Sequence, residues 1–240
     1  MGRLYQRLVV SGLRNAGLII SVSRTTASDV ARFTSRHSPV LLNPLAKTLT
    51  PSDSAPKTPY LLVVSNTGWR KRRWLAIEAW LAIRAASSME LRLVIVGNGH
   101  DLKEENLLTA LEPRVRNSVE IKSHLSDGDL ADLYSSATLL LQLSKYEGFA
   151  WPIIEANSVG TLAICADEPI LRETGEGNFF VDADGLGRVA KSGWNDAMRL
   201  AGDVGIQSKL RARANTFSIE NFDRGLGEIL HASLKDANGF

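Results

Sequence analysis

The glutamates Glu147 and Glu155 stand on either side of a Gly-Phe-Ala-Trp-Pro turn. The apolar run before them, residues 137–143, predicts a buried strand, and Pro152 suits the first position of a helix. The first turn of a helix gathers backbone N–H groups and can hold an anion, and we expect Glu155 to lie in that turn. Carboxylates beside an anion site must serve another part of the ligand, and hydroxyl groups are the obvious candidates.

A basic run, Trp-Arg-Lys-Arg-Arg-Trp, occupies residues 69–74, just beyond another apolar run that predicts a strand. Within it, Lys71 has two interpretations. It is either a surface lysine on a solvated face or a cation that contacts a diphosphate, with Arg70 as its neighbour. Spacing alone leaves the two about even, and the predicted anion site before Glu155 favours the diphosphate.

Composition narrows the class of protein. The chain has 240 residues, 44% of them hydrophobic, and a net charge of +2, which gives no strong attraction to nucleic acid. Cys165 is the only cysteine, so no intrachain disulfide can form and a reducing compartment is indicated. No apolar run approaches the length of a membrane span, and the N-terminus is a poor signal peptide. We expect a cytoplasmic protein, with peripheral attachment to a membrane left open.

Short apolar runs alternate with longer helical patterns, which implies a parallel sheet with helices on both faces. Such sheets bind ligands at the carboxyl ends of their strands, and the loops after Asn66, Gly97, Leu125 and Leu143 open toward that edge. The expected strands are residues 17–23, 39–43, 60–66, 91–97, 119–125, 137–143, 161–165 and 178–184. The expected helices are residues 25–37, 73–86, a polar helix ending near 111, 128–137, one starting at Pro152, and helices from about 186 onward, the last over 218–235.

Two other patterns carry less weight. The Gly-Asn-Gly run at residues 97–99 suggests a dinucleotide fingerprint, but Leu102 stands where its third glycine belongs, so a tight turn between strand and helix is the favoured interpretation. The four histidines are scattered and lack metal-ligand spacing. We therefore expect no metal and no cofactor.

Taken in order, these segments resemble the retaining GT-B glycosyltransferases of the group 1, or family 4, class. Residues 144–167, SKYEGFAWPIIEANSVGTLAICAD, are similar to its Glu-x7-Glu motif. Residues 63–72, VVSNTGWRKR, stand in place of its phosphate loop, and residues 93–100, LVIVGNGH, match its next strand and turn. Similar order continues through residues 119–149 and 169–185, so the resemblance covers about residues 60–215.

The resemblance implies a role for each matching residue. Glu155 would bind the ribose hydroxyls of a nucleotide sugar, and Glu147 would lie near the donor sugar and the reaction centre. Lys71 would bind the diphosphate and stabilise its charge as it leaves. The backbone around Gly148, Phe149 and Ala150 would face the sugar and the diphosphate, and Leu125 with its neighbours would line the base pocket. No metal is required in this scheme.

Some positions depart from the family pattern. Asn66 replaces an arginine of the phosphate loop, so the diphosphate loses one cation unless Arg70 or Arg72 takes its place. Ala150 and Trp151 stand where the family has glycine and leucine. An alanine restricts the backbone, and the tryptophan either narrows the sugar pocket or packs against the sheet, with packing slightly favoured.

The resemblance predicts a Rossmann-like, doubly wound parallel sheet, the C-terminal domain of a GT-B enzyme, with the N-terminal domain largely missing. We divide the chain into a remnant of the acceptor domain (1–48), a linker (49–59), the nucleotide-sugar-binding domain (60–215) and a helix returning toward the N-terminal segment (216–240). Packing of the two ends on each other would leave an apolar patch, and self-association or a partner chain could cover it.

We therefore expect an enzyme that transfers a sugar, with retention, from a nucleotide sugar to a sugar or lipid-linked acceptor. Two alternatives stay open. One is a binding module for nucleotide sugars without catalysis, or a subunit of a split enzyme. The other, more remote, is an NAD-dependent oxidoreductase.

Overall fold

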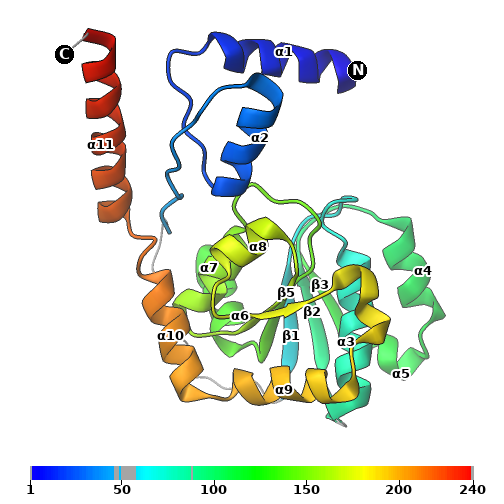
Figure 1. The fold of residues 1–240 in the computed structure, drawn as a ribbon. Coiled ribbons are helices and arrows are strands. Elements are labelled where there is room, and N and C mark those ends of the chain that lie inside the picture. Colours follow the sequence, from blue (N-terminus) through cyan, green and yellow to red (C-terminus); the bar gives the residue numbers. More distant parts are fainter. Residues whose placement is uncertain (1, 46–48, 50–57, 88, 239–240) are drawn as a thin grey trace. The chain divides into compact units, whose positions relative to one another are not determined.

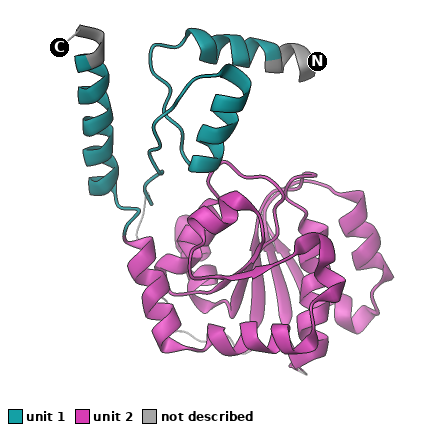
Figure 2. Cartoon of the chain, in the orientation of Figure 1, with its two compact units in different colours: residues 1–46, 216–240 teal, residues 47–215 magenta. Residues whose placement is uncertain are grey.

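The computed structural model describes residues 2–45, 49, 58–87 and 89–238. These residues fall into two compact units, and Figure 2 shows them in different colours. Unit 1 comprises residues 1–46 and 216–240, and unit 2 comprises residues 47–215. Most of the expected linker, residues 49–59, lies outside the described residues. No described helix is long and apolar enough to cross a membrane.

Unit 2 is built on a six-stranded sheet in which every neighbouring pair of strands is parallel. Its strands are mainly apolar, apart from the edge strand of sequence VEIK, and β1, β2, β4 and β5 are almost entirely buried, as expected where helices cover both faces. The expected strands of this unit are confirmed, each shorter than predicted by one to four residues, and β5 ends one residue later. They are β1 (Tyr60–Val64), β2 (Arg92–Val96), β3 (Val119–Lys122), β4 (Leu139–Gln142), β5 (Ala163–Ala166) and β6 (Phe179–Val181).

The strand order is β3-β2-β1-β4-β5-β6, the order of a doubly wound Rossmann-like fold. The chain proceeds outward from β1 to β3 and then returns to add β4 on the other side of β1. The order therefore reverses between β1 and β4. Ligands of open α/β sheets bind at this reversal point, beyond the carboxyl ends of the strands.

Helices pack on the sheet in two groups, which Figure 1 shows on opposite sides of the strands. Helix α3 contacts β1, α4 and α9, whereas α7 contacts β4, β5, α6 and α10. The helices of unit 2 are α3 (Arg73–Ser87), α4 (Leu102–Ala110), α5 (Pro113–Arg116), α6 (Asp127–Ser136), α7 (Trp151–Ser158), α8 (Pro169–Thr174), η1 (Ala183–Arg188), α9 (Lys191–Ala201) and α10 (Val204–Ala214). The sequence analysis did not predict α5 and α8.

Local sequence explains where these helices begin. Asp101 caps α4 by accepting hydrogen bonds from the amides of Lys103 and Glu104. Ser126 and Asp129 form a reciprocal capping box at the start of α6. Helix α3 turns a stripe of alanine, isoleucine and tryptophan toward the sheet, and Trp80 is fully buried there.

Unit 1 contains three helices among the described residues: α1 (Gly2–Asn15), α2 (Arg24–Thr34) and α11 (Ile219–Asn238). The strands expected at residues 17–23 and 39–43 are wrong, because only a single parallel bridge forms, between Ser21 and Val40. The amide of Ser21 donates to the carbonyl of Pro39, and the amide of Leu41 donates to the carbonyl of Ser21. Two strands without further neighbours are only marginally stable, and these two runs pair with no other strand among the described residues.

The two chain ends belong to the same unit. A hollow of about 720 Å³ is lined from both, by Leu18 and Pro39 on one side and by Glu228 and Ile229 of α11 on the other. Apolar side chains of this unit remain exposed among its described residues, namely Leu8, Val9, Phe33, Val40, Ile219, Leu230 and Leu234. Self-association through them stays a prediction.

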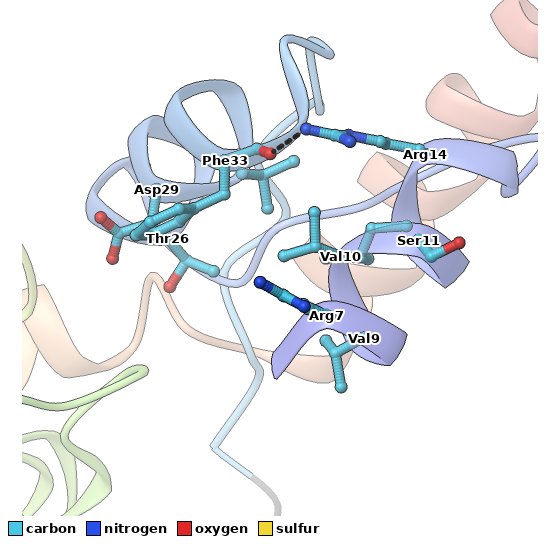
Figure 3. A pocket seen from close by; sticks show the side chains of 10 residues that line it. Arg7, Val9, Val10, Ser11, Arg14, Thr26, Asp29 and Phe33 are labelled. Atoms are coloured by element: carbon cyan, nitrogen blue, oxygen red, sulfur yellow. Dashed lines mark hydrogen bonds between the residues drawn. The ribbon is translucent and has the colours of Figure 1, made fainter. Parts of the chain in front are cut away.

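A second hollow in unit 1, about 740 Å³, lies between α1 and α2 (Figure 3). Val10 and Phe33 contribute apolar surface, and Arg7 and Asp29 contribute charge. The Arg14 guanidinium donates a hydrogen bond to the carbonyl oxygen of Phe33 across it. None of the predicted site residues lines this hollow.

Candidate functional site

The structure brings Lys71 and Glu147 together at the reversal point of the sheet. Lys71 lies in the loop after β1, and Glu147 lies in the loop after β4. The Lys71 ammonium donates to both carboxylate oxygens of Glu147, at 2.7 and 2.8 Å. The lysine side chain is 29% exposed and the glutamate side chain 10% exposed, so the pair is shielded but still open to a ligand. Both residues are predicted from the sequence, but their contact is not.

Gln142 also donates a hydrogen bond to Glu147. Its side chain lies in the last position of β4, is buried, and donates from Nε2 to Glu147 Oε1 at 3.1 Å and to Ser144 Oγ at 2.9 Å. Three donor hydrogens thus converge on the Glu147 carboxylate and fix its orientation. Sequence reasoning missed Gln142, although a single amide at the end of an apolar run was a signal for it.

The loops after β1 and β4 are also joined through their backbones. The amide of Lys145 donates to the carbonyl oxygen of Arg70 at 2.7 Å, and the amide of Lys71 closes a turn on the Gly68 carbonyl at 2.9 Å. Lys71 and Glu147 therefore belong to loops that hold each other in register. The side chain of Arg70 is exposed.

Arg72, one of the two expected substitutes for the arginine of the phosphate loop, is engaged by acidic side chains. Its side chain is 7% exposed and forms ion pairs with Glu168 and Asp184, both at 3.2 Å. Lys145 pairs with the same two carboxylates, at 3.2 and 3.1 Å. The four side chains form a network beside the Lys71–Glu147 pair, and Arg72 is committed to it. Arg70 remains the candidate cation.

The Asn66 side chain binds the loop after β2. Its side-chain oxygen accepts a hydrogen bond from the amide of Asn98 at 2.8 Å, and the amide of Thr67 donates to the Asn98 carbonyl at 2.9 Å. Gly97 permits this approach, because a Cβ at that position would lie 2.1 Å from the carbonyl oxygen of Ser65. Close packing between the two loops thus accounts for the glycine at position 97.

A buried ion pair supports these loops from the core side. The Arg73 guanidinium donates to Glu104 in a bidentate arrangement, with Nε to Oε2 at 2.8 Å, and both side chains are almost fully buried. Arg73 Nη1 also donates to the carbonyl oxygen of Ser65 at 3.2 Å. Sequence reasoning missed this pair, because Arg73 looked like part of a solvated basic run.

The start of α7 departs slightly from the expected form. Trp151 is its first residue and Pro152 its second, and Ala150 precedes them in the left-handed region with φ 67°. The Trp151 ring meets the buried Phe149 edge-on, with centroids 5.2 Å apart, and the favoured packing of the tryptophan against the sheet stays a prediction. Glu155 lies beyond the first turn, which contains no acidic residue, and the expectation of a first-turn position was wrong.

Glu155 contacts a residue that the sequence analysis did not select. The hydroxyl of Tyr134, on α6, donates to Glu155 Oε2 at 2.6 Å. Burial raises the pKa of the Glu155 carboxyl, the hydrogen bond from Tyr134 lowers it, and the charge of Asp127 raises it again. The carboxylate is therefore held in a partly desolvated place by a neutral donor.

Leu125 and its neighbours lie after β3. Leu125 is half-buried and packs against the hydrophobic core, and His124 before it adopts a left-handed backbone with φ 56°. The backbone around Gly148 and Phe149 lies between Glu147 and the start of α7. Within the described part of the chain, no group of three or more His, Cys, Asp and Glu side chains could hold a metal ion.

This architecture defines a class: a Rossmann-like domain with a charged site at the reversal point of its sheet. The family follows from comparison, because residues 48–186 match the model of the glycosyl transferases group 1 family. The match covers more than half of the 240 residues. The chain belongs to this family, and the expected membership of group 1 is confirmed.

Curated relatives agree with the family. The chain is 32% identical over 106 residues to the GDP-mannose:cellobiosyl-diphosphopolyprenol alpha-mannosyltransferase of Xanthomonas campestris, covering 42% of this chain and 28% of that protein. It is 25% identical over 207 residues to the O-antigen chain mannosyltransferase B of Escherichia coli, covering 78% of this chain and 53% of that one. The chain thus spans about half or less of the length of these relatives.

Solved structures share the fold. The Anabaena protein HepE in complex with UDP-glucose aligns with a TM-score of 0.75 at 18% identity, over 94% of this chain and 67% of that one. The sucrose-phosphate synthase of Thermosynechococcus elongatus aligns with a TM-score of 0.74 at 22% identity, over 96% of this chain and 61% of that one. At these identities the likeness establishes the GT-B Rossmann-like fold of the described residues.

Proposed function

We propose that this chain binds a nucleotide sugar at the reversal point of its sheet and serves a retaining transfer of the sugar to an acceptor. The observation that supports this most directly is the Lys71–Glu147 ion pair, which joins a cation and a carboxylate across the loops after β1 and β4. Family membership supplies the reaction class. The ion pair offers groups for the two halves of the donor, a charged diphosphate and a sugar.

Lys71 contacts the diphosphate in this proposal. Its ammonium is close to Glu147 but only partly buried, so a phosphate oxygen can approach it without breaking the pair. Arg70, exposed in the same loop, supplies a second cation. The start of α7 adds the positive end of a helix dipole, and no side chain caps that end.

The proposed reaction breaks the bond between the anomeric carbon of the donor and its phosphate oxygen. The electron pair stays on the diphosphate, whose charge Lys71 and the amides near α7 stabilise without a metal. The acceptor oxygen bonds to the same face of the sugar, and its proton passes to the departing phosphate oxygen. Glu147 orients the donor sugar and stabilises positive charge that develops at its ring.

GDP-mannose is the first donor to test. The two Xanthomonas relatives are named for GDP-mannose, and the E. coli relative is named a mannosyltransferase. The Anabaena structure contains UDP-glucose, so UDP sugars form the second arm of the test. We expect a sugar or lipid-linked acceptor.

Calorimetry with guanosine, uridine and adenosine ligands tests the site. Each is measured as the nucleoside, as the nucleoside diphosphate and as the nucleotide sugar. Lys71→Met should weaken diphosphate binding about tenfold or more and leave nucleoside binding nearly unchanged, because one charge-assisted contact is lost. Lys191→Met, at the start of α9, is a matched control that changes an exposed lysine outside these loops. Equal losses for diphosphate and nucleoside would refute the assignment of Lys71.

Turnover separates the enzyme from a simple binder. Release of free sugar from GDP-mannose or UDP-glucose, and transfer to added sugar and polyprenol-linked acceptors, should be measured with the same protein. Saturable binding without either activity would support a binding module or a subunit of a split enzyme. Binding of NAD in place of these nucleotides would overturn the proposal.

A further inference from the structure

Tyr134 occupies an unusual place for a polar group. It lies on α6, its side chain is fully buried, and its hydroxyl donates to Glu155 Oε2 at 2.6 Å. Its backbone carbonyl accepts a hydrogen bond from Thr161 Oγ1 at 2.7 Å, which ties the end of α6 to the loop before β5. A buried tyrosine needs a partner for its hydroxyl, and here that partner is the carboxylate assigned to the ribose.

The direction of this hydrogen bond is fixed. Burial and the neighbouring charge of Glu155 raise the pKa of Tyr134 well above its usual value, so the phenol stays protonated and can only donate to the carboxylate. One carboxylate oxygen is therefore committed to Tyr134. Among the hydrogen bonds of the described residues, Glu155 Oε1 accepts none, so this oxygen remains for a ligand.

We propose that Tyr134 is a positioning residue that holds Glu155 by one oxygen and turns the other toward the ribose. The preference of the site for a ribose over a deoxyribose then depends on Tyr134. This inference rests on the proposed function, in which Glu155 binds the ribose hydroxyls. Without Tyr134, the carboxylate could rotate about its side-chain bonds, and each hydrogen bond to the ribose would cost more rotamer freedom.

A cycle that changes both the protein and the ligand tests the inference. Affinities are measured by calorimetry for GDP and UDP, each in its ribose, 2′-deoxy and 3′-deoxy form. The unchanged protein should prefer ribose about tenfold over at least one deoxy form. Tyr134→Phe should weaken the ribose form about fivefold and leave the deoxy form within about twofold, because only the ribose contact depends on the orientation of Glu155.

Tyr60→Phe is a matched control. Tyr60 is also buried, and its hydroxyl donates at 2.7 Å to the carbonyl oxygen of Leu133, the residue next to Tyr134. This variant removes the same atom from the same part of the core without touching Glu155. It should leave the ratio of ribose to deoxyribose affinities unchanged, and a change equal to that of Tyr134→Phe would show a general effect of core damage.

A second variant covers the case in which Tyr134→Phe folds poorly because a buried carboxylate loses its donor. The double variant Tyr134→Phe/Glu155→Gln removes that carboxylate as well. If Tyr134 acts only through Glu155, the double variant and Glu155→Gln alone have the same ribose preference. A different preference would overturn the inference.

The outcomes distinguish this inference from the proposed function. If Glu155→Gln abolishes the ribose preference and Tyr134→Phe preserves it, Tyr134 has only a structural role and the inference fails alone. If Tyr134→Phe weakens ribose and deoxyribose forms equally, the inference also fails. If Glu155→Gln leaves the preference intact, the assignment of Glu155 to the ribose is itself wrong.

Discussion

Replacement of Glu147 by glutamine should separate donor binding from sugar transfer. The carboxylate accepts hydrogen bonds from Lys71 at 2.7 and 2.8 Å and from Gln142 at 3.1 Å. Glutamine keeps nearly the same volume and one acceptor oxygen but carries no charge. The variant therefore removes the negative member of the ion pair with little change in packing.

The cost in stability follows from the exposure of the pair. A hydrogen bond to a charged group contributes about 1.5–3 kcal/mol, and breaking a fully buried ion pair costs about 3–5 kcal/mol. The Lys71 side chain is 29% exposed, so water can replace part of the lost contact. We expect Glu147→Gln to lower the free energy of unfolding by about 1–2 kcal/mol, measured by urea denaturation.

Binding and turnover should change in different directions. Lys71 is no longer neutralised in Glu147→Gln, so the affinity for a nucleoside diphosphate should stay the same or rise by up to about fivefold. Sugar transfer or release should fall by about 10²–10³-fold, because the charge that stabilises the transition state is gone. Calorimetry with GDP and UDP and a turnover assay measure the two effects.

Glu90→Gln is the control, because its ion pair with Arg114 is loose, at 3.8 Å, and both side chains are exposed. It should change neither quantity. If Glu147→Gln loses as much diphosphate affinity as Lys71→Met does, the two residues bind the ligand as a unit. That result would refute the separate roles of Lys71 in binding and Glu147 in transfer.

Three further predictions concern the supports of the site. Arg73→Met should lower the free energy of unfolding by about 3–5 kcal/mol in chemical denaturation, because Glu104 is left as an unpaired buried charge, and Arg73→Met/Glu104→Leu should recover part of the loss. Burial raises the pKa of Glu155, so its ionised form destabilises the fold as pH rises through that pKa. The stability of Glu155→Gln relative to the unchanged protein should therefore be higher at about pH 7 than at about pH 4. A gain in stability that is independent of pH would contradict this. Gly97→Ala should destabilise by about 1–3 kcal/mol and weaken diphosphate binding, since its Cβ would meet the Ser65 carbonyl; a normal melting temperature would exclude that clash.

The sequence predicted the sheet of unit 2 well because its strands are apolar runs bounded by turns. It selected Lys71 and Glu147 but not their contact, because 76 residues separate them and the order of strands decides which loops meet. Arg73 and Tyr134 were missed for a different reason. Each lies in a segment that looks ordinary, and only the packing of other elements buries it. The apolar runs at residues 17–23 and 39–43 show the opposite error, since strand-like composition needs neighbours to become a strand.

The reversal of strand order between β1 and β4 has a consequence for folding. The strands β1 to β3 form one contiguous half of the chain in unit 2, and β4 to β6 form the other. Each half contributes one member of the Lys71–Glu147 pair, so the site exists only after the two half-sheets have docked along β1 and β4. That docking closes a long loop of chain and is entropically expensive. A ligand that bridges the pair would bind only the docked halves and would therefore stabilise the contact between them, which is the effect we expect of the proposed nucleotide.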